Sequence, residues 1–321
     1  MKIVVLDGHA LNPGDLSWSA LEALGELTVY DRTPSAAAAQ RAAGAEIVLT
    51  NKTPLRAETL EQLPELRYIG VLATGYDVVD VQAAAEQGVA VTNVPDYGTD
   101  SVAQYVIALL LELCSGVGVH SASVRAGDWS GGEDWCYWRT PLRELTGKTM
   151  GIIGLGRIGL RTAQLAQALG MRVIATTRRM DREAPPGIVW RTQDQLLQEA
   201  DAISLHCPLT PQTEGLIGRE ALRMMKHEAL LINTARGGLV DAQALAAALH
   251  AGTIGGAALD VLAPEPPHPD NPLLRAPRCI VTPHVAWASL EARGRLLDTA
   301  VRNVRAFLDG TPANRVDGVK G

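Results

Sequence analysis

Short apolar runs alternate with segments of helical periodicity along most of the chain. An apolar run that is too short to form a helix is typical of a strand buried on both faces. Before residue 99 the pattern predicts strands over Lys2–Leu6, Leu27–Tyr30, Glu46–Thr50, Tyr68–Leu72 and Val89–Asn93. After residue 148 it predicts strands over Thr149–Ile153, Met171–Thr176, Ile188–Trp190, Asp201–Leu205, Ala229–Asn233, Gly256–Asp260 and Cys279–Thr282. The alternation predicts an α/β fold with two doubly wound parallel sheets.

Two long helices and one irregular segment frame these strands. Ser101–Leu113 is apolar on all sides, so we expect a buried spine helix between two domains. Ser289–Leu308 has apolar residues at helical spacing and is expected to return to the first domain. His120–Thr146 has weak periodicity and is rich in aromatic residues, which indicates either a surface for a partner or a self-contained loop core. Shorter helices are predicted over Ser17–Leu24, Leu55–Leu63, Leu160–Leu169, Gln193–Glu199, Glu220–Met225 and Ala242–His250.

A glycine-rich motif, Gly154-Leu-Gly-Arg-Ile-Gly159, joins the predicted strand Thr149–Ile153 to the helix that follows it. In this context Gly154 permits the tight turn, Gly156 lets the backbone approach a pyrophosphate, and Gly159 lets the helix pack on the strand. Backbone N–H groups at the helix N-terminus then bind the phosphate oxygens. The motif therefore predicts a dinucleotide-binding domain of the Rossmann type.

The composition is compatible with the predicted fold and argues against several classes of function. The 321 residues suffice for two domains, and the contents of 47% apolar and 20% charged residues are ordinary for a globular protein. A net charge of −6 argues against a nucleic-acid or anionic-membrane surface. The four cysteines lie far apart without C-x-x-C spacing, which favours buried free thiols over disulfides or metal ligands. The sequence shows neither a signal-peptide core nor an apolar stretch of bilayer length, so we expect a cytoplasmic protein.

Three side chains near predicted strand ends are candidates for chemistry, because ligands of open α/β sheets bind at the carboxyl ends of the strands. Arg236 has glycine neighbours that leave its guanidinium able to bind a carboxylate through two hydrogen bonds, although a surface arginine beside a turn is a plainer interpretation. Glu265 lies in a proline-stiffened loop, where a solvated acid is commonplace. His284 directly follows a strand and Pro283, and of the seven histidines it is the best placed for acid–base work. A structural histidine is the alternative, and a neighbouring carboxylate would favour the charged form and orient the ring.

Taken in order, these motifs make the chain similar to the D-isomer-specific 2-hydroxyacid dehydrogenases, close to the branch of glycerate dehydrogenases and hydroxypyruvate or glyoxylate reductases. The matching stretches cover essentially the whole chain and are Gly154–Gly159, His206–Thr210, Asn233–Gly237, Ala258–Val261, Pro264–Pro266 and Thr282–His284. The resemblance implies a Rossmann nucleotide domain over residues 99–287 and a flavodoxin-like substrate domain over residues 1–98 and 288–321. It also implies a homodimer in which the aromatic-rich excursion embraces the partner.

The resemblance further implies roles for single residues. Arg236 is expected to bind the substrate carboxylate and polarise the keto group, with His284 as the acid/base and Glu265 as its partner. The expected reaction is the reduction of a small 2-keto acid, hydroxypyruvate or glyoxylate, to the D-2-hydroxy acid. Substrate contacts are expected from Thr74, Gly75, Arg236, His284 and Trp287. Cofactor contacts are expected from Gly154, Gly156, Arg157, Ile158, Gly159, Thr177, Arg178, Arg179, His206, Pro208, Thr213, Thr234, Ala235 and Asp260, the last of them on the nicotinamide amide.

The end of the second strand in the nucleotide domain departs from the commoner pattern. NAD-dependent relatives usually have aspartate there, which accepts hydrogen bonds from the ribose and repels a 2′-phosphate. This chain has Thr177-Arg178-Arg179, so a dianionic phosphate would meet donors instead. Two solvated arginines in a loop are the plainer interpretation. We expect a preference for NADP(H), with NAD(H) as the alternative cofactor.

Two other functions are compatible with such a fold. A non-catalytic regulator would sense the nucleotide and bind other proteins, as corepressor relatives do. A sensor has no need of a general acid, so the joint presence of Arg236, Glu265 and His284 argues against it. Formate or phosphite dehydrogenase chemistry is a third interpretation, and it is disfavoured by Trp287, whose context resembles the glycerate dehydrogenase branch.

Overall fold

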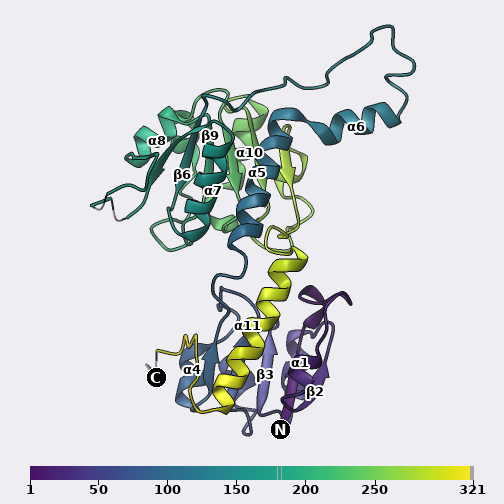
Figure 1. Cartoon of the computed structure of the whole chain (residues 1–321), viewed down its shortest axis with the longest axis vertical. Helices are drawn as coiled ribbons and strands as arrows, with labels where there is room; N and C mark the ends of the chain where they lie inside the picture. Colours follow the sequence, from purple (N-terminus) through teal and green to yellow (C-terminus); the bar gives the residue numbers. More distant parts are fainter. Residues whose placement is uncertain (179, 182, 319–321) are drawn as a thin grey trace. The chain divides into compact units, whose positions relative to one another are not determined.

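The computed structural model describes residues 1–178, 180–181 and 183–318, and the chain divides into two compact units (Figure 1). Unit 1 comprises Met1–Gly98 and Ala288–Gly321, and unit 2 comprises Thr99–Trp287. Each unit is built on its own sheet, and the paired strands of both sheets run parallel. The α/β fold predicted from the alternating pattern is thereby confirmed.

Unit 1 contains a five-stranded sheet in the order β2-β1-β3-β4-β5. Its strands are β1 (Lys2–Val5), β2 (Glu26–Val29), β3 (Ile47–Thr50), β4 (Tyr68–Val71) and β5 (Ala90–Thr92). Its helices are α1 (Ser19–Glu22), α2 (Ala38–Ala42), α3 (Ala57–Leu60), α4 (Val81–Glu86) and α11 (Leu290–Leu308), with short 3-10 helices over Gly8–Ala10 and Ser35–Ala37. The rings of Tyr68 on β4 and Phe307 on α11 pack with their centroids 4.8 Å apart. The last long helix thus belongs to the first unit.

The segment after α11 protects one edge of this sheet. Thr92 and Arg315 form an antiparallel bridge beside the edge strand β5. The N–H group of Val316 donates to the carbonyl oxygen of Val91 at 2.9 Å, and the N–H group of Val91 donates to Asp317 at 3.0 Å. These bonds therefore pair backbone groups of the edge strand within the same chain. Without them, the groups would be open to pairing with another chain.

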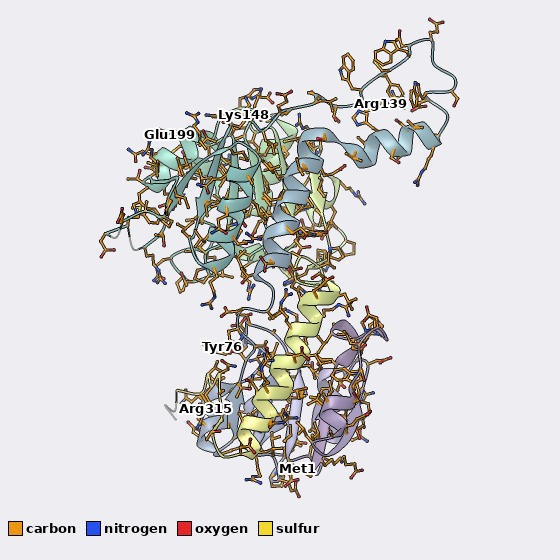
Figure 2. The ribbon with its side chains drawn as sticks, in the orientation of Figure 1. Met1, Tyr76, Arg139, Lys148, Glu199 and Arg315 are labelled. Atoms are coloured by element: carbon orange, nitrogen blue, oxygen red, sulfur yellow. The ribbon has the colours of Figure 1, made fainter. Side chains whose placement is uncertain are left out.

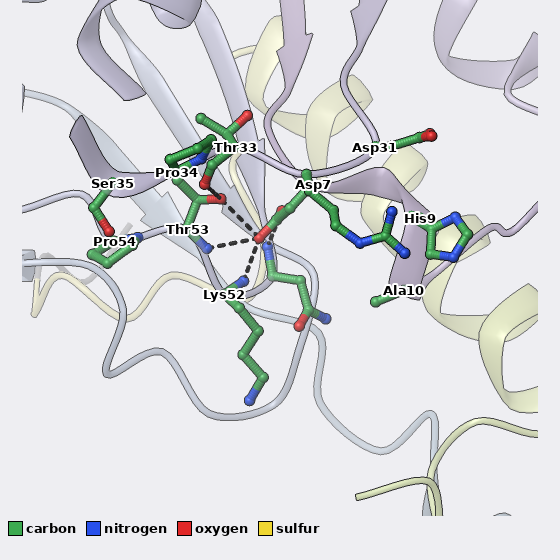
Figure 3. A pocket seen from close by; sticks show the side chains of 12 residues that line it. Asp7, His9, Ala10, Asp31, Thr33, Pro34, Ser35, Lys52, Thr53 and Pro54 are labelled. Carbon is green, nitrogen blue, oxygen red and sulfur yellow. Dashed lines mark hydrogen bonds between the residues drawn. The ribbon is translucent and has the colours of Figure 1, made fainter. Parts of the chain in front are cut away.

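A buried carboxylate ties β1 to the loop after β3. Asp7 accepts hydrogen bonds from the backbone N–H groups of Asn51 (2.7 Å), Lys52 (2.6 Å) and Thr53 (2.7 Å), and from the Thr53 hydroxyl at 3.1 Å. Figure 3 shows these bonds inside a pocket of about 460 Å³, which is lined by the loops that follow β1, β2 and β3. Asp7 therefore holds together the carboxyl ends of strands at the point where the strand order reverses.

Unit 2 contains a seven-stranded sheet in the order β12-β11-β10-β9-β6-β7-β8. Its strands are β6 (Thr149–Ile153), β7 (Arg172–Thr176), β8 (Ile188–Trp190), β9 (Ala202–Leu205), β10 (Leu230–Asn233), β11 (Gly256–Leu259) and β12 (Cys279–Val281). Its helices are α5 (Thr99–Ser115), α6 (Val117–Arg125), α7 (Arg157–Ala168), α8 (Gln193–Glu199), α9 (Arg219–Met224) and α10 (Ala242–His250), with short 3-10 helices over Gly237–Leu239 and Pro272–Arg275. Buried residues of α5 and α7 form one apolar cluster with the sheet, and those of α8, α9 and α10 form another. Helices therefore cover both faces, as in a doubly wound fold.

The aromatic-rich excursion contains a helix, α6, which the sequence pattern did not predict. No residue of α6 is buried, so the segment lacks the apolar stripe by which a helix is found in a sequence. Beyond α6 the chain runs through a long irregular loop that extends from the rest of unit 2, and Figure 2 shows its side chains near the labelled Arg139. Trp135 and Trp138 are 86% and 68% exposed, although the Trp129 indole N–H bonds the Trp135 carbonyl oxygen at 3.0 Å. The loop has internal bonds, yet most of its aromatic surface is uncovered.

Length and apolar content decide whether a helix in the described part of the chain could cross a bilayer. In this part of the chain, no single helix is long and apolar enough to cross a membrane. The pair α5 and α6 reaches that length and composition together, with a bend of 57° between its halves. Six residues of α5 are buried within unit 2.

Candidate active site

Close contacts require glycine at two positions around the turn between β6 and α7, Gly154 and Gly159. Gly154 has φ +97°, and a Cβ atom there would lie 2.6 Å from the backbone nitrogen of Cys207. A Cβ atom at Gly159 would lie 2.2 Å from the carbonyl oxygen of Gly154. At Gly156, the N-cap of α7, a Cβ atom would meet no atom within 4 Å, and no side chain caps the helix. The start of this helix thus has no side-chain cap in the described part of the chain, and the turn fits a dinucleotide pyrophosphate.

The end of β7 lies directly beside this turn. The N–H group of Gly154 donates to the carbonyl oxygen of Thr176, the last residue of β7, at 2.9 Å. Thr177 is half-buried and Arg178 is exposed. Arg179, the third residue predicted to read the adenosine ribose, lies outside the described residues. Thr177 and Arg178 therefore follow a residue that bonds directly to the first glycine of this turn.

The loop after β9 presents a neutral histidine and a closed turn. Burial lowers the pKa of His206 to about 4, so its imidazole carries no charge near neutral pH, and its Nε2 lies 2.9 Å from the Ser204 hydroxyl. The Thr213 hydroxyl donates to the carbonyl oxygen of Pro208 at 2.7 Å and accepts from the N–H group of Thr210 at 2.8 Å. These bonds fix the loop that carries the predicted cofactor residues His206, Pro208 and Thr213 at the carboxyl end of the sheet.

The loop after β10 presents Arg236 at the same edge. The Asn233 side chain braces this loop, since it donates to the carbonyl oxygen of Arg236 at 2.8 Å and accepts from the N–H group of Ala235 at 3.0 Å. A Cβ atom at Gly237 would lie 2.0 Å from the carbonyl carbon of Leu262, so this position must be glycine for the two loops to approach. The Arg236 side chain is exposed and bonds only a neighbouring backbone oxygen, that of Ala235, in the described part of the chain. Its guanidinium is therefore available to an anionic ligand.

A second feature of the same loop is an unsatisfied hydroxyl. The Oγ1 atom of Thr234 is buried and has no hydrogen-bond partner among the described residues. Buried hydroxyls normally have a partner in proteins. A bound ligand is one source of such a partner, and Thr234 was predicted to contact the cofactor.

Glu265 and His284 come together across two loops. Glu265 Oε2 lies 2.6 Å from His284 Nδ1, and Glu265 Oε1 accepts a hydrogen bond from the N–H group of Leu262 at 3.1 Å. The side chains are 33% and 29% exposed, so the pair is partly screened from water and still open to a ligand. A carboxylate on Nδ1 fixes the ring and leaves Nε2 for proton exchange.

His284 has an unusual backbone conformation. Its φ is +56°, in the left-handed region that favours glycine, at a cost on the order of 1–3 kcal/mol. Its N–H group donates to the carbonyl oxygens of Asp260 (2.8 Å) and Thr282 (3.0 Å), and its own carbonyl oxygen accepts from the Trp287 indole at 2.9 Å. Strained conformations of this kind persist where surrounding contacts impose them, and they cluster at functional sites.

Two polar side chains that support this turn, those of Thr282 and Ser101, received no role in the sequence analysis. The Thr282 hydroxyl donates to Asp260 at 2.6 Å, and the Ser101 hydroxyl on α5 donates to the carbonyl oxygen of Ala286 at 2.7 Å. Thr282 belongs to the Thr-Pro-His motif, so the sequence contained a signal that Thr282 lies at the site. Ser101 had none, because 185 positions separate it from Ala286.

The remaining predicted substrate residues lie in unit 1, in the loop after β4. The Thr74 hydroxyl donates to the carbonyl oxygen of Val94 at 3.0 Å, and the Asn93 side chain donates to the carbonyl oxygen of Thr74 at 2.8 Å. These bonds fix the loop, and the substrate contacts of Thr74 and Gly75 stay a prediction. In the described ranges no cluster of three or more histidine, cysteine or acidic side chains is suited to a metal ion.

Comparison with known proteins finds relatives that match nearly the whole chain. The family described as D-isomer specific 2-hydroxyacid dehydrogenase, NAD binding domain, matches residues 107–286. A hydroxypyruvate reductase of Blautia hydrogenotrophica is 50% identical, over 99% of this chain and 100% of its own length. A glycerate dehydrogenase of Methylorubrum extorquens is 48% identical over 87% of both chains. The structure of a Lactobacillus jensenii D-lactate dehydrogenase with NAD⁺ superimposes with a TM-score of 0.81 at 30% identity and covers 100% of both chains.

These matches extend over both units and include the nucleotide fold, the glycine turn and the strand ends described above. The chain is therefore an enzyme that uses a nicotinamide cofactor on 2-hydroxy or 2-keto acids. It belongs to the D-isomer-specific 2-hydroxyacid dehydrogenase family, in the branch of the glycerate dehydrogenases and hydroxypyruvate reductases.

Proposed function

We propose that this enzyme reduces hydroxypyruvate and glyoxylate to D-glycerate and glycolate, with His284 as the acid/base. The observation that carries the proposal is the 2.6 Å contact between Glu265 and His284 at the carboxyl edge of the nucleotide sheet. The loop of Arg236 packs beside it, because Gly237 approaches the start of the Glu265 loop. The names of the relatives from Blautia and Methylorubrum support the substrate class.

The residues present fit a nicotinamide dinucleotide. The glycine turn and the first residues of α7 would hold its pyrophosphate, and the loops with His206, Thr213 and Thr234 would line its nicotinamide half. When bound in its reduced form, such a cofactor supplies a hydride for the keto carbon. The chain itself must bind the acid, orient the keto group and provide the proton.

Different side chains would bind the substrate carboxylate and donate the proton. Arg236 would bind the substrate carboxylate through two hydrogen bonds and stabilise the negative charge that develops on the keto oxygen. Protonated His284 would then transfer the proton on Nε2 to that oxygen. Glu265, through Nδ1, would keep the ring oriented and stabilise its positive charge before transfer. Oxidation of the hydroxy acid follows the reverse course, with His284 as the base.

A panel of 2-keto acids tests the substrate class. We expect kcat/KM to be higher for hydroxypyruvate and glyoxylate than for phenylpyruvate or a branched keto acid, because a small pocket excludes bulky side chains. Spectrophotometric assays with NADPH and with NADH provide the measurement. A higher kcat/KM for a bulky acid would contradict the proposed substrates, and absence of any hydride transfer would favour the nucleotide-sensing regulator.

We also propose that NADP(H) is the preferred cofactor. A 2′-phosphate at the end of β7 would meet Thr177 and Arg178, which begin beside the glycine turn, and no carboxylate follows the strand directly. Hydrogen bonds to charged groups contribute about 1.5–3 kcal/mol each, so the preference should exceed tenfold in kcat/KM.

Substitution at this strand end tests the cofactor preference. Thr177→Asp combined with Arg178→Gln and Arg179→Gln should lower kcat/KM for NADPH by about 100-fold, because a carboxylate then repels the phosphate and its donors are lost. The value for NADH should change much less. Arg223→Gln, which removes an exposed arginine paired with Glu220 on α9, is the control. A native enzyme more efficient with NADH would overturn this proposal.

The exposed aromatic loop supports a homodimer. Trp129, Trp135, Trp138 and Leu142 are all more than half exposed, at 52%, 86%, 68% and 61%. Large apolar side chains that are exposed together on one segment usually pack against the surface of another protein. We propose that a second copy of this chain covers the loop.

A further inference from the structure

The turn that carries His284 is attached to the neighbouring strand by a buried carboxylate. Asp260 follows β11 and His284 follows β12, and these two strands pair in parallel. Asp260 is 1% exposed, and its carboxylate accepts hydrogen bonds from the N–H groups of Val285 (3.0 Å) and Ala286 (2.8 Å). Its carbonyl oxygen also accepts the N–H group of His284 at 2.8 Å. One residue thus holds three successive N–H groups of the turn.

Thr282 completes this arrangement from the other side of the histidine. Its hydroxyl donates to Asp260 Oδ1 at 2.6 Å, and that same oxygen accepts the N–H group of Val285. Thr282 thereby fixes the direction of the carboxylate that holds the turn. A β-branched residue at the end of a strand has a restricted χ1 angle, so the hydroxyl itself is well placed for this bond.

The left-handed conformation of His284 makes such support necessary. A non-glycine residue leaves this region unless surrounding contacts impose it. Rotation of the backbone at His284 would move the imidazole away from Glu265, which lies only 2.6 Å from Nδ1. The contacts of Asp260 and Thr282 are therefore suited to maintain the contact between Glu265 and His284.

We propose that Thr282 and Asp260 form a positioning pair, in which the Thr282 hydroxyl orients the Asp260 carboxylate and the carboxylate holds His284 in the conformation that meets Glu265. The proposal rests on the acid/base role proposed for His284. It gives Asp260 a function within the chain, in addition to the nicotinamide contact expected from the resemblance. Thr282 contributes to the reaction through His284 and need not touch the substrate.

A pair of substitutions at one position tests the proposal in the intact enzyme. Thr282→Val keeps the shape of the side chain and removes the hydroxyl, whereas Thr282→Ser keeps the hydroxyl and removes the methyl group. Because misplacement of a catalytic group by about 1 Å can cost 10²-fold in rate, we expect Thr282→Val to lower kcat for reduction by about 10- to 100-fold. The KM for hydroxypyruvate and the Kd for NADPH should stay within about twofold, since no binding group is removed.

Two controls separate positioning from general loss of structure. Thr282→Ser should stay within about threefold of the native kcat, because it restores the bond to Asp260. Thr162→Val makes the same exchange at a fully buried threonine of α7 whose hydroxyl has no partner in the described chain, and it should keep the native kcat. A crystal structure of Thr282→Val should show the Nδ1–Glu265 distance lengthened or the positive φ of His284 lost.

The outcomes distinguish this proposal from the function on which it rests. A native kcat in Thr282→Val, or an equal loss in Thr282→Ser, overturns the positioning pair. A weaker NADPH Kd with unchanged kcat also overturns it, and would assign Thr282 and Asp260 to the cofactor alone. If His284→Gln retains full activity, the acid/base assignment itself fails, whatever the Thr282 variants do.

Discussion

Replacement of His284 by glutamine is expected to lower kcat for keto-acid reduction by about 10²–10⁴-fold, the range that a positioned general acid commonly contributes. Glutamine retains a polar side chain but cannot deliver a proton of suitable acidity to the keto oxygen. The KM for the keto acid should change little, because the proton is needed chiefly in the transition state. Steady-state rates at saturating substrate and NADPH give the measurement.

A second histidine provides a matched control for this experiment. His268 Nδ1 lies 3.0 Å from the Asp270 carboxylate, so its local contact is similar to that of His284, but both side chains are largely exposed. His268→Gln should therefore retain native kcat and KM. Near-native reduction by His284→Gln at saturation would exclude it as the general acid, and a comparable loss in His268→Gln would indicate a nonspecific effect.

Replacement of Arg236 by glutamine should affect both binding and turnover. The variant would lose the proposed two-pronged contact with the carboxylate and one donor to the developing oxyanion, so we expect kcat/KM for hydroxypyruvate to fall by about 10³-fold. Arg236→Lys should recover little of this loss, because an ammonium group cannot reproduce the planar fork of the guanidinium. The measurement is kcat and KM for each variant.

Substrate chemistry supplies the control for Arg236. Hydroxyacetone has a keto group and a hydroxymethyl group but no carboxylate, so the native enzyme should reduce it poorly. The glutamine variant should lose much less activity on hydroxyacetone than on hydroxypyruvate. Equal losses on both compounds would show that Arg236 supports the site without binding the carboxylate.

Most strands and the glycine turn were predictable because each has a local signal. The buried strands β3 and β6 are apolar runs, and the turn at Gly154–Gly159 has a spacing that phosphate binding and helix packing require. Several strands end one residue earlier than predicted. Leu6 and Asp260, for example, lie just beyond β1 and β11, although each still donates its N–H group to a neighbouring strand.

What the sequence could not indicate depends on contacts between distant residues. The positive φ of His284 accompanies a bond from its N–H group to Asp260, which is 24 positions away, and a histidine has no local preference that predicts it. The bond between Ser101 and Ala286 joins α5 to the same turn. The roles of Arg236, Glu265 and His284 came from the resemblance, since strand-end position alone left plainer interpretations open.

The carboxylate of Asp7 makes a strand end of unit 1 different from the glycine turn of unit 2. Three successive N–H groups, those of Asn51, Lys52 and Thr53, converge on it at a strand end of unit 1, in the manner of a cradle for an oxyanion. To bind these N–H groups, a phosphate would have to displace the Asp7 carboxylate, which belongs to the same chain. Unit 1 thus occupies these N–H groups with its own carboxylate, whereas no side chain caps α7 at Gly156 in the described part of the chain.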